Sequence, residues 1–185
     1  MPIENTAAGE LELIVPNLHR RYSGVTATNR MVAPKLAKMF RAGWLGSHRP
    51  DGIDAMGFVD LMRLWRRARP LIWHARRNDE MIAGLALRAL GWPLKLLFTS
   101  AAQRHHTWLT RWLIRNMDAI IATSPLSASY LTREATVVMH GVDTDRYAPP
   151  ADRAAAFAES GLPGRYAIGC FGRVRAQKGS DVFVE

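Results

Sequence analysis

The sequence predicts an α/β fold with a parallel sheet, and two observations support that prediction. Short apolar segments alternate with amphipathic segments from residue 10 to residue 139, which is typical of a parallel sheet covered by helices on both faces. The first apolar segment runs into Ser23-Gly24 and then into a helical segment. Many α/β folds that handle nucleotides begin with this order of strand, glycine turn and helix.

Strands are expected where the sequence is short, apolar and bounded by turn residues. In the first of them Leu11, Leu13 and Val15 alternate, and Pro16 is expected to end it. Residues 40–57 contain several glycines and are expected to form loops with one short strand. The strands expected outside that segment are 10–17, 71–73, 94–99, 119–122, 136–139 and 166–171.

Helices are expected between these strands. Phe58, Leu61, Met62 and Trp65 have the i, i+3, i+4, i+7 spacing of an amphipathic helix. Ser124-Pro125 is a strong helix start, because a serine cap precedes a proline at the first helical position. The expected helices are 25–39, 58–69, 78–91, 101–117, a segment from 124, part of the alanine-rich stretch 151–164, and a start at Ser180.

The same spacing predicts which large side chains are buried. Tryptophans at helical spacing or in strands are assigned to the core: Trp65, Trp73, Trp108 and Trp112. Trp44 and Trp92 adjoin glycines and are expected to be partly exposed, whereas Cys170, inside the last strand, is expected to be buried.

The composition limits the class of protein. The chain has 185 residues, of which 48% are apolar and 22% charged, and this excludes a disordered chain. Its single cysteine excludes an intramolecular disulfide framework and fits a reducing cytosol. We find no secretory signal at the start, and the longest apolar stretch, 81–98, is interrupted by charge and proline, so no transmembrane helix is predicted. The net charge of +9 favours a polyanionic partner: nucleic acid, a phosphate-bearing ligand or anionic lipid.

Three segments could carry chemistry. Gly172-Arg173 and Lys178-Gly179 follow a predicted buried strand. A glycine turn with two cations at this position suits the binding of a diphosphate. The same residues are also compatible with a solvated basic loop that binds nothing. His140-Gly141-Val142-Asp143 lies before the alanine-rich stretch, and Ser23-Gly24 follows the first strand; each of these is also compatible with an ordinary turn.

In this order, the three segments resemble those of glycosyltransferase family 4, whose members are retaining enzymes of the GT-B fold. The stretches Trp73–Asn78 and Phe98–Thr107 are similar to those of bacterial lipopolysaccharide core mannosyltransferases. The resemblance covers residues 10–185. Two positions depart from the family pattern, because Ser100 stands where many members carry a histidine and His140 stands where an asparagine is usual.

The resemblance implies a GT-B architecture. Residues 1–150 would form a Rossmann-like acceptor-side domain, 151–164 a linker, and 165–185 the first strand and turn of a second Rossmann-like domain that binds the nucleotide sugar. The family's paired glutamates would lie beyond Glu185, so the catalytic residues are not assigned and the chain by itself, a fragment on this interpretation, is expected to be inactive.

The implied reaction transfers a hexose with retention, with mannose from GDP-mannose as the expected donor and a lipopolysaccharide inner-core or lipid A precursor as the acceptor. No cofactor and no metal are expected, since basic side chains and helix ends would neutralise the leaving diphosphate. Another nucleotide-sugar-dependent transferase of polysaccharide or glycolipid assembly is the alternative within this class. A non-catalytic basic module that binds membrane or nucleic acid is the alternative outside it.

The site residues that the resemblance implies fall into three groups. The donor diphosphate would be held by Gly172, Arg173, Lys178 and Gly179. The acceptor-side cleft would contain Ser23, Gly24, His74, Arg76, Arg77, Ser100 and Arg104, although His74 is equally compatible with a satisfied core histidine. The hinge between the domains would contain His140, Gly141 and Asp143.

Basic residues cluster in two further places. Several arginines lie within 63–77, and Arg104, Arg111 and Arg115 are expected to share a helix face. A solvated face is one interpretation of these charges. The other is contact with a lipid-linked acceptor and an anionic inner-membrane surface, which would place the protein peripherally on the cytoplasmic face of that membrane. Nucleic acid is not expected as a partner, because no nucleic-acid motif is recognised.

Overall fold

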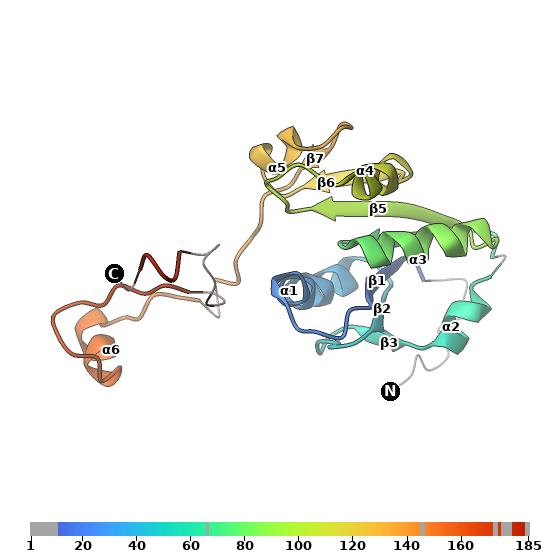
Figure 1. Cartoon of the computed structure of the whole chain (residues 1–185). Helices are drawn as coiled ribbons and strands as arrows, with labels where there is room; N and C mark the ends of the chain where they lie inside the picture. Colours follow the sequence, from blue (N-terminus) through green and yellow to red (C-terminus); the bar gives the residue numbers. More distant parts are fainter. Residues whose placement is uncertain (1–10, 66, 145–146, 172–173, 175–178, 184–185) are drawn as a thin grey trace. The chain divides into compact units, whose positions relative to one another are not determined.

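The computed structural model describes residues 11–65, 67–144, 147–171, 174 and 179–183 (Figure 1). The chain divides into two units, Met1–Gly141 and Val142–Glu185. The division lies within the segment predicted to be a hinge. The extents predicted for the two domains stay predictions.

The first unit is built on a seven-stranded sheet in which all neighbouring strands are parallel, in the order β3-β2-β1-β4-β5-β6-β7. The chain moves outward in one direction from β1 to β3 and in the other from β4 to β7, as in Rossmann-like folds. The prediction of a parallel α/β sheet is therefore confirmed. The strands are β1 Leu13–Asn17, β2 Ala42–Gly46, β3 Asp54–Met56, β4 Leu71–Ala75, β5 Leu94–Ser100, β6 Ala119–Ala122 and β7 Thr136–Val137.

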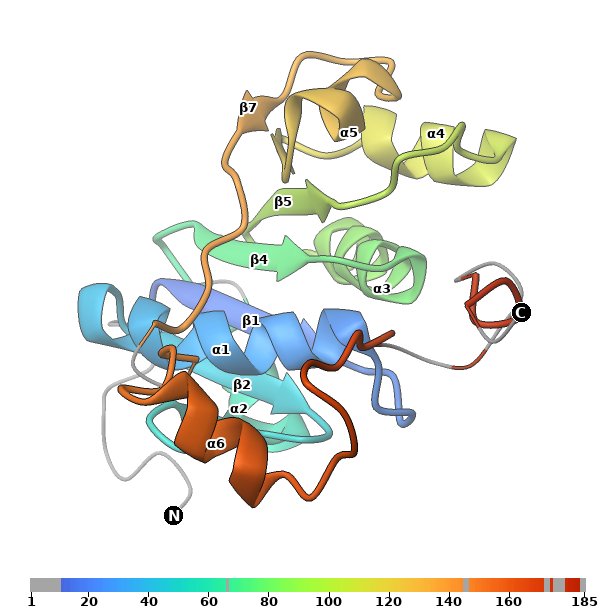
Figure 2. The ribbon, with the colours of Figure 1, turned by 90° about the vertical axis from the view of Figure 1, so that its left-hand side faces the viewer.

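Helices cover both faces of this sheet (Figures 1 and 2). Residues of β1 alternate between two apolar clusters, since Ile14 packs on the side of α2, α3 and α4 and Leu13 and Val15 pack on the side of α1. This is why all five residues of β1 are buried. The helices of the first unit are α1 Gly24–Met39, α2 Phe58–Arg63, α3 Asn78–Ala89, α4 Trp108–Arg115 and α5 Pro125–Ser129.

Pro16 does not end the first strand, contrary to the prediction. Pairing between β1 and β4 covers Leu13 and Ile14 only, whereas pairing with β2 continues to Asn17. The missing N–H of Pro16 therefore breaks no ladder, and proline is tolerated where one side of a strand is unpaired.

Residues 40–57 contain two strands, not one. The glycines that suggested a loop serve close packing instead, because a Cβ at Gly43 would lie 2.3 Å from the sulfur of Met56. Trp44 and Trp92 are 1% and 7% exposed, so the prediction of partial exposure is wrong. Trp92 donates from its indole N–H to the Leu61 carbonyl at 2.9 Å, which satisfies its polar atom inside the core.

The predicted helix 101–117 is much shorter in the structure. It begins only after Thr107, whose hydroxyl accepts from the Thr110 N–H at 3.3 Å, so Arg104 lies outside it. Its buried face is formed by Thr110, Leu113 and Ile114. Trp108 and Trp112 are 73% and 52% exposed, and their assignment to the core is wrong.

The predictions for the helix 58–69 and for the burial of Trp65 and Trp73 have different outcomes. The predicted helix 58–69 ends at Arg63, and within it only Leu61 is buried. Trp65 is 48% exposed, so its assignment to the core is also wrong, whereas Trp73 is 1% exposed, as predicted.

In the second unit the helix α6, Arg153–Glu159, begins at Asp152, whose carboxylate accepts from two backbone N–H groups. The predicted strand 166–171 is not formed, and Phe171 is 96% exposed. Cys170 is exposed too, contrary to the prediction. A strand is stable only beside another strand, and the described part of this unit contains no other. At the predicted start near Ser180, the Phe183 N–H donates to the Gly179 carbonyl at 2.9 Å, which closes a single turn.

Candidate functional site

The candidate site lies at the carboxyl edge of the sheet. Because all strands are parallel, Asn17, Ala75 and Ser100 at the ends of β1, β4 and β5 lie at the same edge. The arrowheads of β2, β4 and β5 point the same way in Figure 2. The order of connection reverses between β1 and β4, and ligands of open α/β sheets bind at such a switch point.

Arg77 connects the two sides of the switch point. Its guanidinium, at the start of α3, donates to the side-chain amide oxygen Oδ1 of Asn17 at 3.2 Å, to the Ser23 hydroxyl at 2.7 Å and to the Thr26 hydroxyl at 2.8 Å. Its side chain is only 14% exposed and lies 3.5 Å from the carboxylate of Glu80. One planar side chain thus holds the end of β1 and the beginning of α1 against α3.

The Glu80 carboxylate contacts both the Arg77 guanidinium and the Arg76 backbone. Its side chain is fully buried, and its second oxygen accepts from the Arg76 backbone N–H at 2.7 Å. Burial raises the pKa of Glu80 to about 7, against the opposing effects of the Arg76 N–H and the Arg77 charge. Burial also lowers the pKa of Arg76 to about 10, although the Glu80 carboxylate acts to raise it. The Nε of Arg76 is buried, and no described residue bonds to it.

The glycine turn opens beside Arg77. Ser23 is the cap of α1, because its hydroxyl accepts from the Thr26 N–H at 3.4 Å. A Cβ added to Gly24 would meet no atom within 4 Å. Gly24 therefore leaves open space beside the start of α1, and the N-terminus of a helix suits the approach of an anionic group.

His74 and Ser100 lie farther along the same edge. The His74 ring nitrogen Nε2 lies 2.7 Å from the Thr99 hydroxyl on β5, and burial, followed by the Arg76 charge, lowers the pKa of His74 to about 3. The imidazole is therefore neutral near pH 7. The hydroxyl of Ser100 is buried, and no described residue bonds to it.

The structure thus brings Ser23, Gly24 and Arg77 together. Arg104 is exposed on the connection after β5, and His140 and Gly141 end the first unit. Of the predicted diphosphate residues, Gly179 has a φ of +67°. The other three lie outside the described residues: Gly172, Arg173 and Lys178.

Sequence reasoning missed Asn17, Thr26 and Glu80. The position of Asn17 at the end of the first strand was a usable signal, because the carboxyl ends of parallel strands form the site. Glu80 falls in the first turn of the predicted helix 78–91, where an acid has an ordinary explanation in the helix dipole. Arg77 lies only three residues before it, so the ion pair is local, but the burial of that pair depends on how α3 packs against the sheet.

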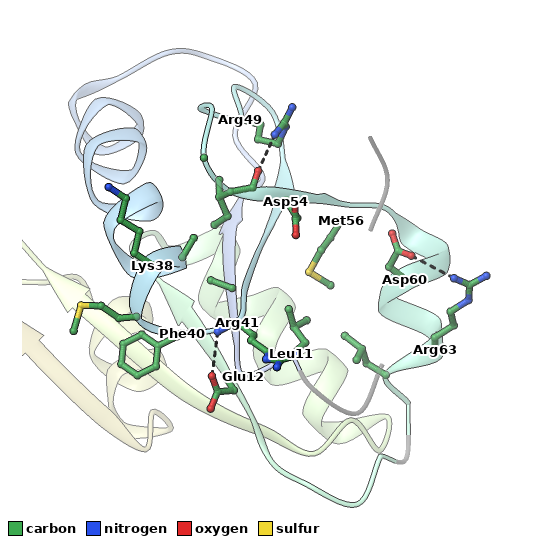
Figure 3. Close-up of a pocket in the computed structure, with 16 residues that line it drawn as sticks. Leu11, Glu12, Lys38, Phe40, Arg41, Arg49, Asp54, Met56, Asp60 and Arg63 are labelled. Carbon is green, nitrogen blue, oxygen red and sulfur yellow. Dashed lines mark hydrogen bonds and ion pairs between the residues drawn. The ribbon is translucent and has the colours of Figure 1, made fainter. Parts of the chain in front are cut away.

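A pocket of about 770 Å³ lies at the opposite, amino edge of the sheet (Figure 3). Leu11 and Glu12 before β1, Arg41 before β2 and Asp60 and Arg63 of α2 contribute to its wall, and the last two form an ion pair at 3.7 Å. No predicted site residue lines this pocket. It is therefore separate from the candidate site.

Within 11–65, 67–144 and the described parts of the second unit, no group of three or more His, Cys, Asp or Glu side chains is placed to hold a metal ion. No helix in the same residues has the length and apolar character needed to cross a bilayer.

Comparison with known proteins gives two curated relatives. The lipopolysaccharide core biosynthesis mannosyltransferase LpcC of Rhizobium leguminosarum bv. viciae is 49% identical over 180 residues, which are 95% of this chain and 51% of the relative. The lipopolysaccharide core biosynthesis mannosyltransferase LpsB of Rhizobium meliloti is 46% identical over 182 residues, which are 95% of this chain and 52% of the relative. No protein-family model and no solved structure matches the chain.

The chain spans about half the length of both relatives. Identity near one half over nearly the whole chain is far above what fold likeness alone produces. The predicted resemblance is confirmed: this chain is similar along almost all of its length to lipopolysaccharide core mannosyltransferases, and its Rossmann-like parallel sheet is consistent with a GT-B glycosyltransferase domain.

Proposed function

We propose that the chain forms the acceptor-side half of a mannosyltransferase of lipopolysaccharide core synthesis. The observation that carries the proposal is its similarity to the two named mannosyltransferases over 95% of its length. The polar cluster at the switch point supports it, because that cluster lies where open α/β sheets bind ligands.

The proposed donor is GDP-mannose. In the reaction the bond between the mannose anomeric carbon and the diphosphate breaks, and a hydroxyl of the acceptor forms the new bond at that carbon with retention. Negative charge develops on the departing diphosphate, so fixed cations and N–H groups beside it stabilise the transition state. We assign this role to Gly172, Arg173, Lys178 and Gly179, with no metal and no cofactor.

Arg77 is assigned a positioning role in this reaction. Its bonds to Ser23 and Thr26 fix the first turn of α1, and they leave the open side of Gly24 free for the donor or the acceptor. Holding such a turn before the substrate arrives removes the entropic cost of ordering it later.

The proposed acceptor is a lipid-linked inner-core saccharide, and the proposed location is the cytoplasmic face of the inner membrane, where the protein is held peripherally by anionic lipid. The net charge of +9 supports this location. Nucleic acid is not a proposed partner.

A chimera tests the proposal. In it, residues 1–185 replace the matched segment of LpcC, and transfer of labelled mannose from GDP-mannose to a deacylated core acceptor is measured. We expect transfer by the chimera and none by residues 1–185 alone, because residues 1–185 span only about half the length of the relatives.

Intact LpcC is the positive control, and the chimera carrying Arg77→Ala is the matched negative. A chimera that folds and binds GDP-mannose but transfers no mannose to any core acceptor would contradict the proposed function. Transfer by residues 1–185 alone would contradict the two-domain interpretation.

A further inference from the structure

The helix α4 has two distinct faces. Thr110, Leu113 and Ile114 form the buried face. The opposite stripe has the spacing i, i+3, i+4, i+7 and consists of Trp108, Arg111, Trp112 and Arg115, all exposed. Two indoles and two guanidiniums therefore alternate along one outer face. We call this stripe, together with Leu109 at its side, the α4 outer face.

The charge on this face is uncompensated within the described structure. The sequence of α4, WLTRWLIR, contains no acid, and none of the ion pairs found among the described residues includes Arg111 or Arg115. Asp118, just beyond the helix, is engaged by Arg88 at 2.9 Å. A further cation, Arg133, donates to the carbonyls of Ile114, Arg115 and Met117 at the end of the helix.

Four arginines of the segment 63–77 already have partners within the protein. Arg63 pairs with Asp60, Arg67 donates to the Leu11 carbonyl, and Arg76 and Arg77 belong to the partly buried switch-point cluster. The structure therefore separates these arginines from the pair on α4, which remains directed to solvent.

We propose that the α4 outer face lies flat against a bilayer that contains anionic phospholipid, with Trp108 and Trp112 at the level of the headgroups and Arg111 and Arg115 on lipid phosphates. Tryptophan is enriched at this depth because its ring is apolar and its N–H is polar. Short helices with aromatic and cationic residues bind in the plane of the interface. The proposal rests on the membrane association proposed above and names the surface responsible for it.

The experiment measures co-sedimentation of residues 1–185 with vesicles of phosphatidylcholine mixed with phosphatidylglycerol, and with vesicles of phosphatidylcholine alone. We expect binding to the anionic vesicles only, and weaker binding as salt is added. Each arginine near an anionic surface contributes about fivefold in affinity, so Arg111→Gln/Arg115→Gln lowers the partition coefficient about 25-fold.

The paired variant Trp108→Ala/Trp112→Ala removes the apolar contribution and is expected to lower the partition coefficient about tenfold or more. Matched controls change exposed residues elsewhere. Arg20→Gln/Arg21→Gln removes the same charge, and Met39→Ala/Phe58→Ala removes side chains that are 72% and 71% exposed. Both controls are expected to retain most of the binding.

Three outcomes would overturn the proposal. The first is no vesicle binding at low salt, and the second is an equal loss of vesicle binding in the controls and in the α4 variants. The third is normal vesicle binding by α4 variants whose oligomeric state has changed, which would assign the face to a protein partner. Mannose transfer by the chimera to a soluble deacylated acceptor does not require a membrane. Its loss therefore reports on the proposed function alone.

Discussion

At the scale of single residues, Arg77 connects the end of β1 and the start of α1 to α3. It joins Asn17, Ser23 and Thr26 while pairing with a carboxylate that has no contact with water. Removing this side chain would take a polar partner from three buried residues, Asn17, Thr26 and Glu80, and such a loss is costly inside a protein.

We expect Arg77→Ala to lower the free energy of unfolding by about 2–4 kcal/mol, since it leaves the buried Glu80 carboxylate without its cation. Urea unfolding of residues 1–185 measures this as a lower midpoint at unchanged slope. Arg115→Ala, at an exposed position, is the matched control, with an expected change within about 0.5 kcal/mol. Equal midpoints for the two variants would show that Arg77 does not hold the turn.

Glu80 gives a pH dependence of defined sign. Its pKa is about 7 in the folded chain, raised from 4.5, so between these values the folded state holds a proton that the unfolded state has released. Stability attributable to Glu80 therefore falls as pH rises from about 4.5 to about 7 and is constant outside that window. His74, with its pKa lowered to about 3 from 6.5, acts in the opposite direction, with stability lost as pH falls below 6.5.

Because the two windows overlap, the measurement must be a difference. The free energy of unfolding of Glu80→Gln minus that of the original chain is expected to rise across pH 4.5 to 7, by an amount on the order of 1–3 kcal/mol. Urea titrations at several pH values provide it. A flat difference would mean that Glu80 stays ionised throughout.

At the scale of elements, α3 is fitted closely to the sheet. Gly84 faces Trp73 of β4 and Leu96 of β5, and an added Cβ would lie 2.7 Å from the indole and 3.0 Å from the leucine methyl. Trp73 in turn donates to the Glu80 carbonyl at 2.8 Å, so its ring cannot easily move away. The position of α3, and with it that of Arg77, depends on this contact.

We expect Gly84→Ala to destabilise the chain by about 1–2 kcal/mol, because overpacking outweighs the helix propensity that alanine adds. Gly24→Ala is the matched control, since its Cβ would meet nothing within 4 Å and stability should be unchanged or slightly higher. Thermal unfolding of both variants checks the pair. A stabilised Gly84→Ala would show that α3 can shift without cost.

The elements also show where sequence patterns fail. The spacing of Trp108 and Trp112 predicted that both are in the core, yet the core face is Thr110, Leu113 and Ile114. On a helix of eight residues, two overlapping apolar stripes are almost equally plausible from sequence. Only the direction in which the helix meets the sheet decides between them.

At the scale of the whole molecule, the first unit contains the complete sheet and both apolar clusters. No described residue of the second unit belongs to either cluster. The cooperative part of folding should therefore reside in the first unit.

We expect residues 1–141 to unfold in one cooperative transition at nearly the same urea midpoint as residues 1–185, because both apolar clusters lie within residues 1–141. Circular dichroism and tryptophan fluorescence should give coincident curves for both chains. A truncated chain that loses its transition would show that residues 142–185 are needed to complete the core.

The sequence by itself determined the alternation of strands and helices, the start of α5 at Ser124-Pro125 and the resemblance to glycosyltransferases, because each depends on residues close together in the chain. Tertiary structure alone decided the rest. Gly43 lies in a buried strand because Met56 packs against it. Trp108 and Trp112 are exposed because α4 turns Thr110, Leu113 and Ile114 toward the core. Glu80 is buried because α3 packs against the sheet, where Trp73 of β4 donates to the Glu80 carbonyl. Burial is a relation between elements far apart in sequence, and local periodicity does not contain it.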